Sequence, residues 1–234
     1  MHESAFGRLV SVLIAPGKTF RSIAERPTWV VAFAVLLVLG LVAFLLFVQR
    51  ADFLEIARQQ MEAEGREMPP EMEQAGGMIR GCGMAVGLIG PMFIYFGVPL
   101  VLWGVFALLG GTINYRTSLA VSLHAMMPKA VEALLEIPVV LSRDSLGYED
   151  LKTGMLMSSL GAFAPEDTGP VLLELLASME FFTIWCVVLL MIGYRIAAKV
   201  SLGKAAAAVL GLWAVGIAIK VGLAALGAAQ GGGA

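Results

Sequence analysis

Residues 28–48 read TWVVAFAVLLVLGLVAFLLFV and contain no charged side chain. A helix needs about 20 predominantly apolar residues to cross the hydrocarbon core of a bilayer. The stretch is longer than the apolar core of a cleaved signal peptide, which has about 7–15 residues. We therefore expect this segment to remain in the protein as a membrane span.

The composition of the whole chain also indicates an integral membrane protein. Of the 234 residues, 59% are hydrophobic and 15% are charged, whereas soluble domains have about 25% charged residues. A compact soluble fold of this length lacks the interior volume for so much apolar surface. The composition excludes a disordered chain, a disulfide scaffold and an ordinary cytosolic enzyme. The net charge of −2 provides no basic field for binding nucleic acid.

Four further apolar stretches complete a predicted all-α, polytopic helical bundle with five spans. The predicted spans cover residues 28–48, 84–110, 119–141, 178–199 and 205–227. Pro91 and Pro99 should kink or break the second span. The third span carries His124, Lys129, Glu132 and Glu136, so we expect it to be the kinked, partial or re-entrant one. A lone histidine such as His124 is usually hydrogen-bonded within the bundle.

The distribution of charge predicts the orientation of the spans. Lys and Arg concentrate in short cytoplasmic loops of membrane proteins. With the N-terminus inside, the inner segments contain eight basic and two acidic residues. The outer loops, residues 49–80 and 142–177, contain six basic and thirteen acidic residues. We therefore predict a bacterial inner-membrane protein with its N-terminus inside and its C-terminus outside. Within the second outer loop, Pro170 is placed to open a helix that runs into the fourth span.

Residues 1–27 form a predicted cytoplasmic segment with amphipathic character. Its apolar side chains recur at helical spacing, and Pro16-Gly17 interrupts them: Phe6, Leu9, Val10, Leu13, Phe20 and Ile23. This pattern favours a helix that lies on the inner leaflet and is broken by a turn. Packing of the same segment under the bundle is the alternative.

Ionisable side chains inside the predicted spans are the candidate functional residues. They are Lys129, Glu132, Glu136, Glu180 and Lys220. A charge at the centre of a membrane helix costs at least about 2.5–3.5 kcal/mol on insertion scales. In the predicted orientation these residues lie from mid-depth outward, where they line a polar pocket or pair to hold the bundle together. We expect Lys220 to have a carboxylate partner, with Glu180 as the first choice and Glu136 as the second.

Glycines recur every seven residues along the second predicted span. They are Gly83, Gly90, Gly97, Gly104 and Gly111. A face without side chains lets a neighbouring helix approach closely. We expect Gly97 to be a closer contact than Gly87, which lies outside this register. Packing within one chain and a seam between two copies both account for the spacing.

The chain contains no sequence signature of a catalytic or metal site. It has no phosphate-binding loop, no His-Glu-x-x-His and no Gly-x-Ser-x-Gly. Cys82 and Cys186 are too few for a metal cluster. We interpret them as two buried free thiols, with a single bridge between them as the alternative. The sequence predicts no catalytic residue, no metal and no cofactor.

Several segments resemble the Yip family of Ypt/Rab-interacting membrane proteins, in its bacterial branch. Residues 178–194, SMEFFTIWCVVLLMIGY, resemble the fourth span of that family, and SLGKA at 201–205 resembles the loop that follows it. PGKTF at 16–20 and PTW at 27–29 resemble the segment before the first span. The resemblance implies a membrane adaptor; eukaryotic members act in vesicle trafficking through Rab GTPases. The predicted inner segment of about 27 residues is shorter than in eukaryotic members, which weighs against GTPase binding.

These patterns favour a non-catalytic membrane scaffold or adaptor that acts through protein partners. The alternative is a component of a transporter that handles an ion, a proton or a lipid headgroup in the predicted polar pocket. Expected partners are membrane lipids and other membrane proteins, including a transport complex, and a second copy of the chain is an open alternative. An intramembrane enzyme is disfavoured because no nucleophile–base pair is visible.

Overall fold

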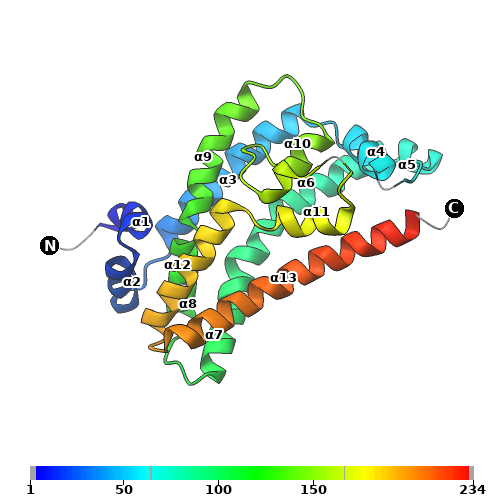
Figure 1. Ribbon diagram of the computed structural model, residues 1–234. Coiled ribbons are helices and arrows are strands. Elements are labelled where there is room, and N and C mark those ends of the chain that lie inside the picture. The colour runs from blue at the N-terminus through cyan, green and yellow to red at the C-terminus, as the bar shows by residue number, and fades with distance from the viewer. Residues whose placement is uncertain (1–3, 64, 166, 232–234) are drawn as a thin grey trace. The chain divides into compact units, whose positions relative to one another are not determined.

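The computed structural model describes residues 4–63, 65–165 and 167–231, and every regular element in these ranges is a helix (Figure 1). The elements are α1 (Ala5–Ile14), α2 (Pro16–Glu25), α3 (Val30–Arg50), α4 (Phe53–Ala63), α5 (Pro70–Gln74), α6 (Gly76–Met92), the π-helix η1 (Phe93–Gly97), α7 (Val98–Leu108), α8 (Tyr115–Ala125), α9 (Met127–Leu141), α10 (Tyr148–Thr153), the 3-10 helix η2 (Leu160–Phe163), α11 (Pro170–Ala177), α12 (Phe181–Ala197) and α13 (Leu202–Gly231). The predicted all-α class is confirmed.

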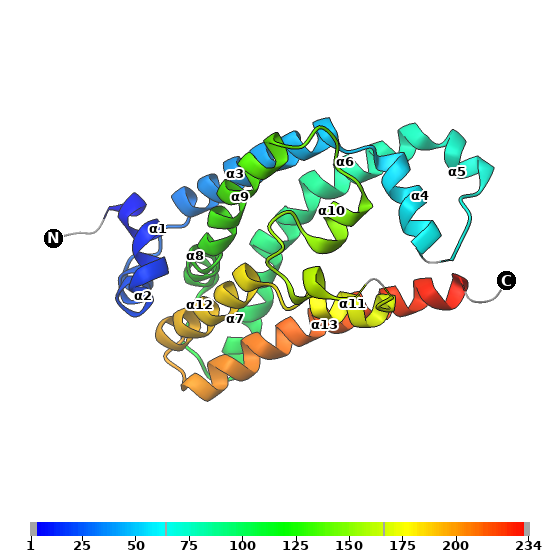
Figure 2. The ribbon, with the colours of Figure 1, turned by 45° about the horizontal axis from the view of Figure 1, so that its top comes forward.

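The chain divides into two compact units. Unit 1 contains residues 1–41, 90–133 and 182–214, and unit 2 contains residues 42–89, 134–181 and 215–234. The helices α3, α6, α9 and α13 each contain residues of both units. Figure 2 shows the helices from a second direction. Each unit is described below by its own contacts.

Three helical stretches in the described residues are long and apolar enough to cross a membrane. They are Val30–Arg50, Gly76–Leu108 and Leu202–Ala229. The other two predicted spans differ from expectation, so the predicted count of five is not confirmed. Residues 119–141 are divided between α8 and α9, and α12 has 17 residues. At 1.5 Å per residue, 17 residues extend about 25 Å, which is less than the roughly 30 Å of a hydrocarbon core.

The second span is irregular between its two prolines, as predicted. Pro91 lies inside α6, η1 follows it, and Pro99 occupies the first turn of α7. Proline removes a backbone donor and its ring clashes with the preceding turn. The wider π-turns absorb this mismatch while the helix continues. The helical run also begins at Gly76, eight residues before the predicted start. The Gly-rich stretch before Met84 is therefore helical as well.

The break in the third predicted span has a local cause at Pro128. Asn114 caps the start of α8 by accepting a hydrogen bond from the Thr117 amide (2.9 Å). The helix ends at Ala125, and α9 begins at Met127. Proline favours the first turn of a helix and cannot donate to the turn before it. Pro128 therefore starts a new helix, and residues 119–141 form two helices where the sequence predicted one span.

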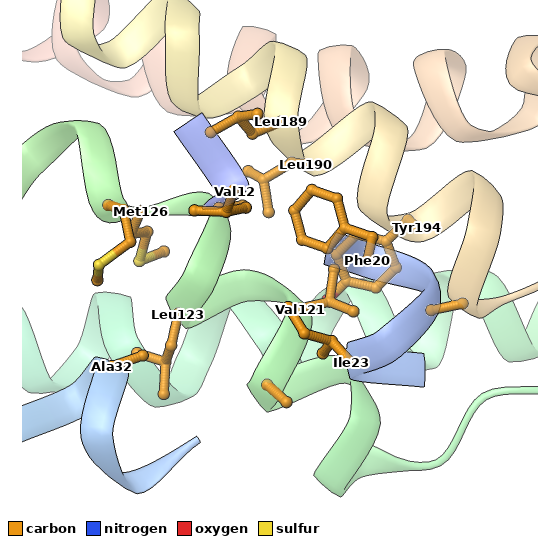
Figure 3. Packing of buried hydrophobic residues seen from close by; sticks show 14 of the residues in the cluster. Val12, Phe20, Ile23, Ala32, Val121, Leu123, Met126, Leu189, Leu190 and Tyr194 are labelled. Atoms are coloured by element: carbon orange, nitrogen blue, oxygen red, sulfur yellow. The ribbon is translucent and has the colours of Figure 1, made fainter. Parts of the chain in front are cut away.

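The core of unit 1 joins the N-terminal helices to α8 and α12 (Figure 3). Its largest buried side chains include Val12, Phe20 and Ile23 from α1 and α2, Val121 and Leu123 from α8, and Leu189, Leu190 and Tyr194 from α12. Gly193 makes this contact close, since an added Cβ would lie 2.7 Å from Val121 Cγ1 and 2.9 Å from Phe20 Cε1. The N-terminal segment thus packs under the bundle with one face, which was the alternative interpretation of its sequence.

Unit 2 is organised by backbone hydrogen bonds between its connecting segments. The Leu146 amide donates to the Arg50 carbonyl (3.0 Å). The Phe181 amide donates to the Ser158 carbonyl (3.0 Å), and the Leu160 amide donates to the Met179 carbonyl (3.2 Å). Pro170 opens α11 as expected, but α11 does not run straight into α12. The residues between these helices pair with the 158–160 segment instead.

The close glycine contacts of α6 differ from the predicted register. An added Cβ would collide with the Phe44 ring at Gly87 and would lie 2.7 Å from Phe53 Cδ1 at Gly83. At Gly90, Gly97 and Gly104 an added Cβ would meet no atom of the described chain within 4 Å apart from the adjacent residues and nearby backbone of its own helix. At Gly111 it would lie 2.9 Å from the Phe106 carbonyl oxygen. The expectation that Gly97 packs more closely than Gly87 is therefore wrong within one chain. A seam between two copies at the open glycines stays a prediction.

Replacing Gly87 by Ala should destabilise the protein, because the new methyl group meets the Phe44 ring. Overpacking of this kind typically costs about 1–3 kcal/mol. The matched variant Gly97→Ala should leave stability almost unchanged in the monomer, because its methyl group enters open space. The measurement is thermal unfolding of both variants in the same mild detergent. Equal losses for the two variants would contradict the observed packing.

Candidate functional site

Three hydroxyl groups form a buried hydrogen-bond network at the centre of unit 1. Tyr194 Oη lies 2.5 Å from Ser118 Oγ and 2.9 Å from Ser122 Oγ. Ser118 Oγ donates to the Pro99 carbonyl (2.7 Å). Because that bond uses the only hydroxyl proton of Ser118, Tyr194 donates to Ser118 and Ser122 donates to Tyr194. All three side chains are 0% exposed.

The network connects three helices through one side chain. Tyr194 comes from α12, Ser118 and Ser122 come from consecutive turns of α8, and Pro99 belongs to α7. The Tyr194 ring also stacks on Phe106 of α7, with centroids 4.6 Å apart and an interplanar angle of 11°. Polar side chains that bond across helices fix the packing of membrane bundles. This site was not predicted from the sequence, although Ser118 and Ser122 at i, i+4 in an apolar helix were a visible signal.

Replacing Tyr194 by Phe should destabilise unit 1 by about 1–3 kcal/mol, because Ser122 loses its hydroxyl partner in a buried site. Tyr115→Phe is the matched control. Its hydroxyl donates one bond of 3.2 Å to the Phe96 carbonyl from a half-buried position, so its loss should cost less. Thermal unfolding of both variants in one detergent measures the difference. A larger loss for Tyr115→Phe would contradict the central place of Tyr194.

His124 is hydrogen-bonded inside the bundle, as its sequence context predicted. Its side chain is 2% exposed, and Nδ1 lies 2.8 Å from the Ala120 carbonyl oxygen. A carbonyl only accepts, so Nδ1 carries the proton and donates this bond. The imidazole is thereby held against its own helix, α8.

The predicted ionisable cluster forms two separate ion pairs among its contacts. Lys129 Nζ lies 2.7 Å from Glu132 Oε2 on α9, and the Glu132 side chain is 15% exposed. Lys220 Nζ lies 3.5 Å from Glu174 Oε1, with the Lys220 side chain 61% exposed. The Lys129–Glu132 pair belongs to unit 1 and the Lys220–Glu174 pair to unit 2.

The partner of Lys220 is not either of the predicted residues. A carboxylate lies within about 4 Å of Lys220, as expected for an ion pair, but it is Glu174 of α11. The sequence analysis placed residue 174 in an outer loop and considered only acids inside predicted spans. Glu136 and Glu180 are half-buried and have interactions of their own. A pocket that gathers all five predicted residues remains a prediction.

The turns after α7 and α12 are joined by hydrogen bonds in unit 1. The Thr112 amide donates to the Ala198 carbonyl (3.2 Å), and Lys204 Nζ donates to the Leu109 carbonyl (3.0 Å). Lys204 thus satisfies a carbonyl at the C-terminal end of α7, where the helix dipole favours a cation. The C-terminal end of α7 and the N-terminal end of α13 therefore lie next to each other in unit 1.

Comparison with known proteins covers these same elements. The model of the Yip1 domain family matches residues 10–223, which run from α1 into α13. The chain belongs to the Yip1 domain family. The membrane protein YknW of Bacillus subtilis (strain 168) is 28% identical to this Yip1-domain protein over 188 residues, which cover 79% of this chain and 76% of YknW. No solved structure matches the chain. The family confirms the resemblance carried by residues 178–194 and establishes an integral membrane protein.

Proposed function

We propose that this Yip1-domain protein is a non-catalytic membrane scaffold or adaptor that acts through protein partners. The observation that carries the proposal is that almost all buried polar side-chain atoms of the described residues form hydrogen bonds within the chain. Among buried side-chain nitrogen and oxygen atoms of the described residues, Arg8 Nε alone has no hydrogen-bond partner. The hydroxyls of Ser118, Ser122 and Tyr194 bond to one another. Polar groups engaged in this way hold helices together and are not available to bind a substrate.

The outer surface of the spans offers the area that partners need. In the most apolar 18-residue window of the span Leu202–Ala229, only 6% of residues are buried within the chain. Val215 and Leu223 of α13 are more than half exposed. Side chains of this kind contact lipid tails or the helices of another membrane protein. A face this open supports partners in the membrane, and membrane lipids cover it where no protein does.

Five spans with the N-terminus inside and the C-terminus outside remain our proposed topology in a bacterial inner membrane. The helices α8, α9 and α12 lie between two ends that are hydrogen-bonded together, at Thr112 and Ala198. This contact supports a path in which these helices leave one side of the membrane and return to it. On this path the C-terminus lies on the same side of the membrane whether α8, α9 and α12 cross the membrane fully or enter it only partly. The excess of basic residues in the inner segments supports the orientation.

Cysteine labelling tests the topology. In a chain with Cys82 and Cys186 replaced by serine and alanine, a single cysteine at Ser4 should resist a membrane-impermeant maleimide in intact cells. A single cysteine at Gln230 should react. Permeabilised cells serve as the control, because both positions should then react. Reaction of both positions from the same side in intact cells would refute the proposed orientation.

Site-specific photocrosslinking tests the adaptor role. A photoreactive amino acid at Val215 or Leu223, both exposed on α13, should give a discrete adduct with another membrane protein in living cells. The control position is Leu189, which is 2% exposed in the core and should give none. The same partner should remain bound after extraction in mild detergent. Adducts with lipid alone at every exposed position of α13 would contradict an adaptor.

The alternative, a transporter component, predicts a different result for the ion pair at Lys220. The observation that favours it is the ion pair between Lys220, a charge within the long apolar helix α13, and Glu174 (3.5 Å). The double variant Lys220→Met with Glu174→Gln removes both charges of this pair together, so it leaves no carboxylate without its partner. An adaptor should keep its crosslinked partner in this variant. A transporter that uses these charges should stay folded and assembled but lose flux in proteoliposomes.

A further inference from the structure

The N-terminal helix α1 has two apolar faces, and only one of them is covered. Leu9 and Val12 are buried in the core of unit 1. On the opposite side, Phe6, Val10 and Ile14 are 69%, 63% and 80% exposed. These three residues are spaced by four, so they form one continuous stripe along the helix. In water, such a stripe of large side chains indicates an interaction surface.

A buried arginine fixes α1 beside the entrance to the first span. Arg8 Nη1 donates to the Arg26 carbonyl (2.9 Å) and lies 3.2 Å from Thr28 Oγ1. Arg8 is 7% exposed, so its guanidinium is buried and connects α1 to the residues just before α3. The apolar span α3 begins at Val30, two residues after Thr28. Arg8 therefore holds α1 beside the N-terminal end of α3, the first helix long and apolar enough to cross a membrane.

The neighbouring helix α2 presents cations on its uncovered side. Its buried residues are Thr19, Phe20 and Ile23, and the exposed residues on the other side include Lys18 and Arg21. Arg26 is exposed just after the helix, and Glu25 is the one acid among residues 4–27. Cations near a bilayer are attracted by anionic lipid headgroups. A membrane surface of this charge complements both helices.

We infer that α1 and α2 form an interfacial module that binds an anionic phospholipid surface. The stripe of Phe6, Val10 and Ile14 lies among the headgroups and upper acyl chains, and Lys18 and Arg21 face the phosphates. Such helices bind through buried apolar area together with attraction to anionic lipids. The opposite faces of α1 and α2 pack on α8 and α12 (Figure 3), so lipid binding at the surface stabilises the core of unit 1.

Spin labels in the full-length protein test where the stripe lies. In the background without Cys82 and Cys186, a nitroxide at Val10 is measured in vesicles of phosphatidylcholine with about 30% phosphatidylglycerol. We expect collisions with oxygen to exceed collisions with a water-soluble nickel complex, and the reverse at a label on Arg21. A label at Val10 open to nickel would overturn the proposal. A label protected from both reagents would also overturn it, because a second copy or a protein would then cover the stripe.

The lipid dependence of stability tests the anionic preference. A ligand that binds only the native state raises the unfolding temperature, so phosphatidylglycerol should raise it relative to phosphatidylcholine. Lys18→Gln with Arg21→Gln should remove most of this rise, since each cation contributes about fivefold to binding, equivalent to about 1 kcal/mol. Arg58→Gln with Arg66→Gln removes two cations from another part of the chain and should retain it. Equal shifts in both double variants would overturn the assignment to α2.

The results expected from the spin labels and from the lipid dependence of stability do not depend on the proposed topology or adaptor role. The vesicles carry the same lipids in both leaflets, so the spin-label pattern is independent of the side on which the N-terminus lies. Failure of the labelling or crosslinking experiments therefore leaves the lipid inference intact. A water-exposed stripe in vesicles rejects the lipid inference while leaving the other two proposals standing.

Discussion

The hydrogen bonds of the Tyr194 hydroxyl determine much of how the helices of unit 1 pack together. In a bilayer, apolar side chains gain little by leaving lipid for a protein interior, so close packing and hydrogen bonds must select the arrangement of helices. Tyr194 supplies both: its hydroxyl bonds to two serines of α8, and its ring stacks on Phe106 of α7. The directional bonds fix the rotation of α8 and α12 about their axes. Gly193, directly before Tyr194, then gives room for Phe20 and Val121.

The same constraint explains why the N-terminal helices are part of the domain. Phe20 of α2 packs against Gly193 of α12. Arg8 of α1 forms hydrogen bonds with the Arg26 carbonyl and Thr28 Oγ1, just before the start of α3. Arg8 is one of the buried polar residues of this packing, and Thr19 of α2 is another. The match of the family model from residue 10 onward agrees with this arrangement, since it includes the second half of α1 and all of α2.

The features predicted correctly from sequence were those with a local cause. The uncharged stretch at 28–48 corresponds to α3, and Pro91 and Pro99 mark the irregular part of the second span. The errors came from properties that depend on a neighbour. A seven-residue glycine spacing does not say which glycine faces a bulky side chain. Phe53 lies against the predicted Gly83, but Phe44 lies against Gly87, which is outside the register.

The candidate site was predicted less well, for a related reason. Charged residues stand out in an apolar sequence, so the sequence analysis concentrated on them, and their pairing then depended on segment boundaries. Glu174 was overlooked as the partner of Lys220 because α11 was placed in a loop. The serines of the Tyr194 network carry no charge, and their i, i+4 spacing alone does not identify Tyr194 as their partner. Their importance arises only when α8 and α12 meet.

The interior of this protein is used for packing, and the contacts that we propose for it lie at its surface. The buried hydroxyls bond to one another or to backbone, and His124 bonds to its own helix. Changes to these groups therefore act first on stability. The exposed stripe of α1 and the exposed side chains of α13 contribute little to the internal core, so their size and apolar character are not explained by folding of one chain. Lipid at α1 and a partner helix at α13 would each remove apolar surface that the fold leaves uncovered.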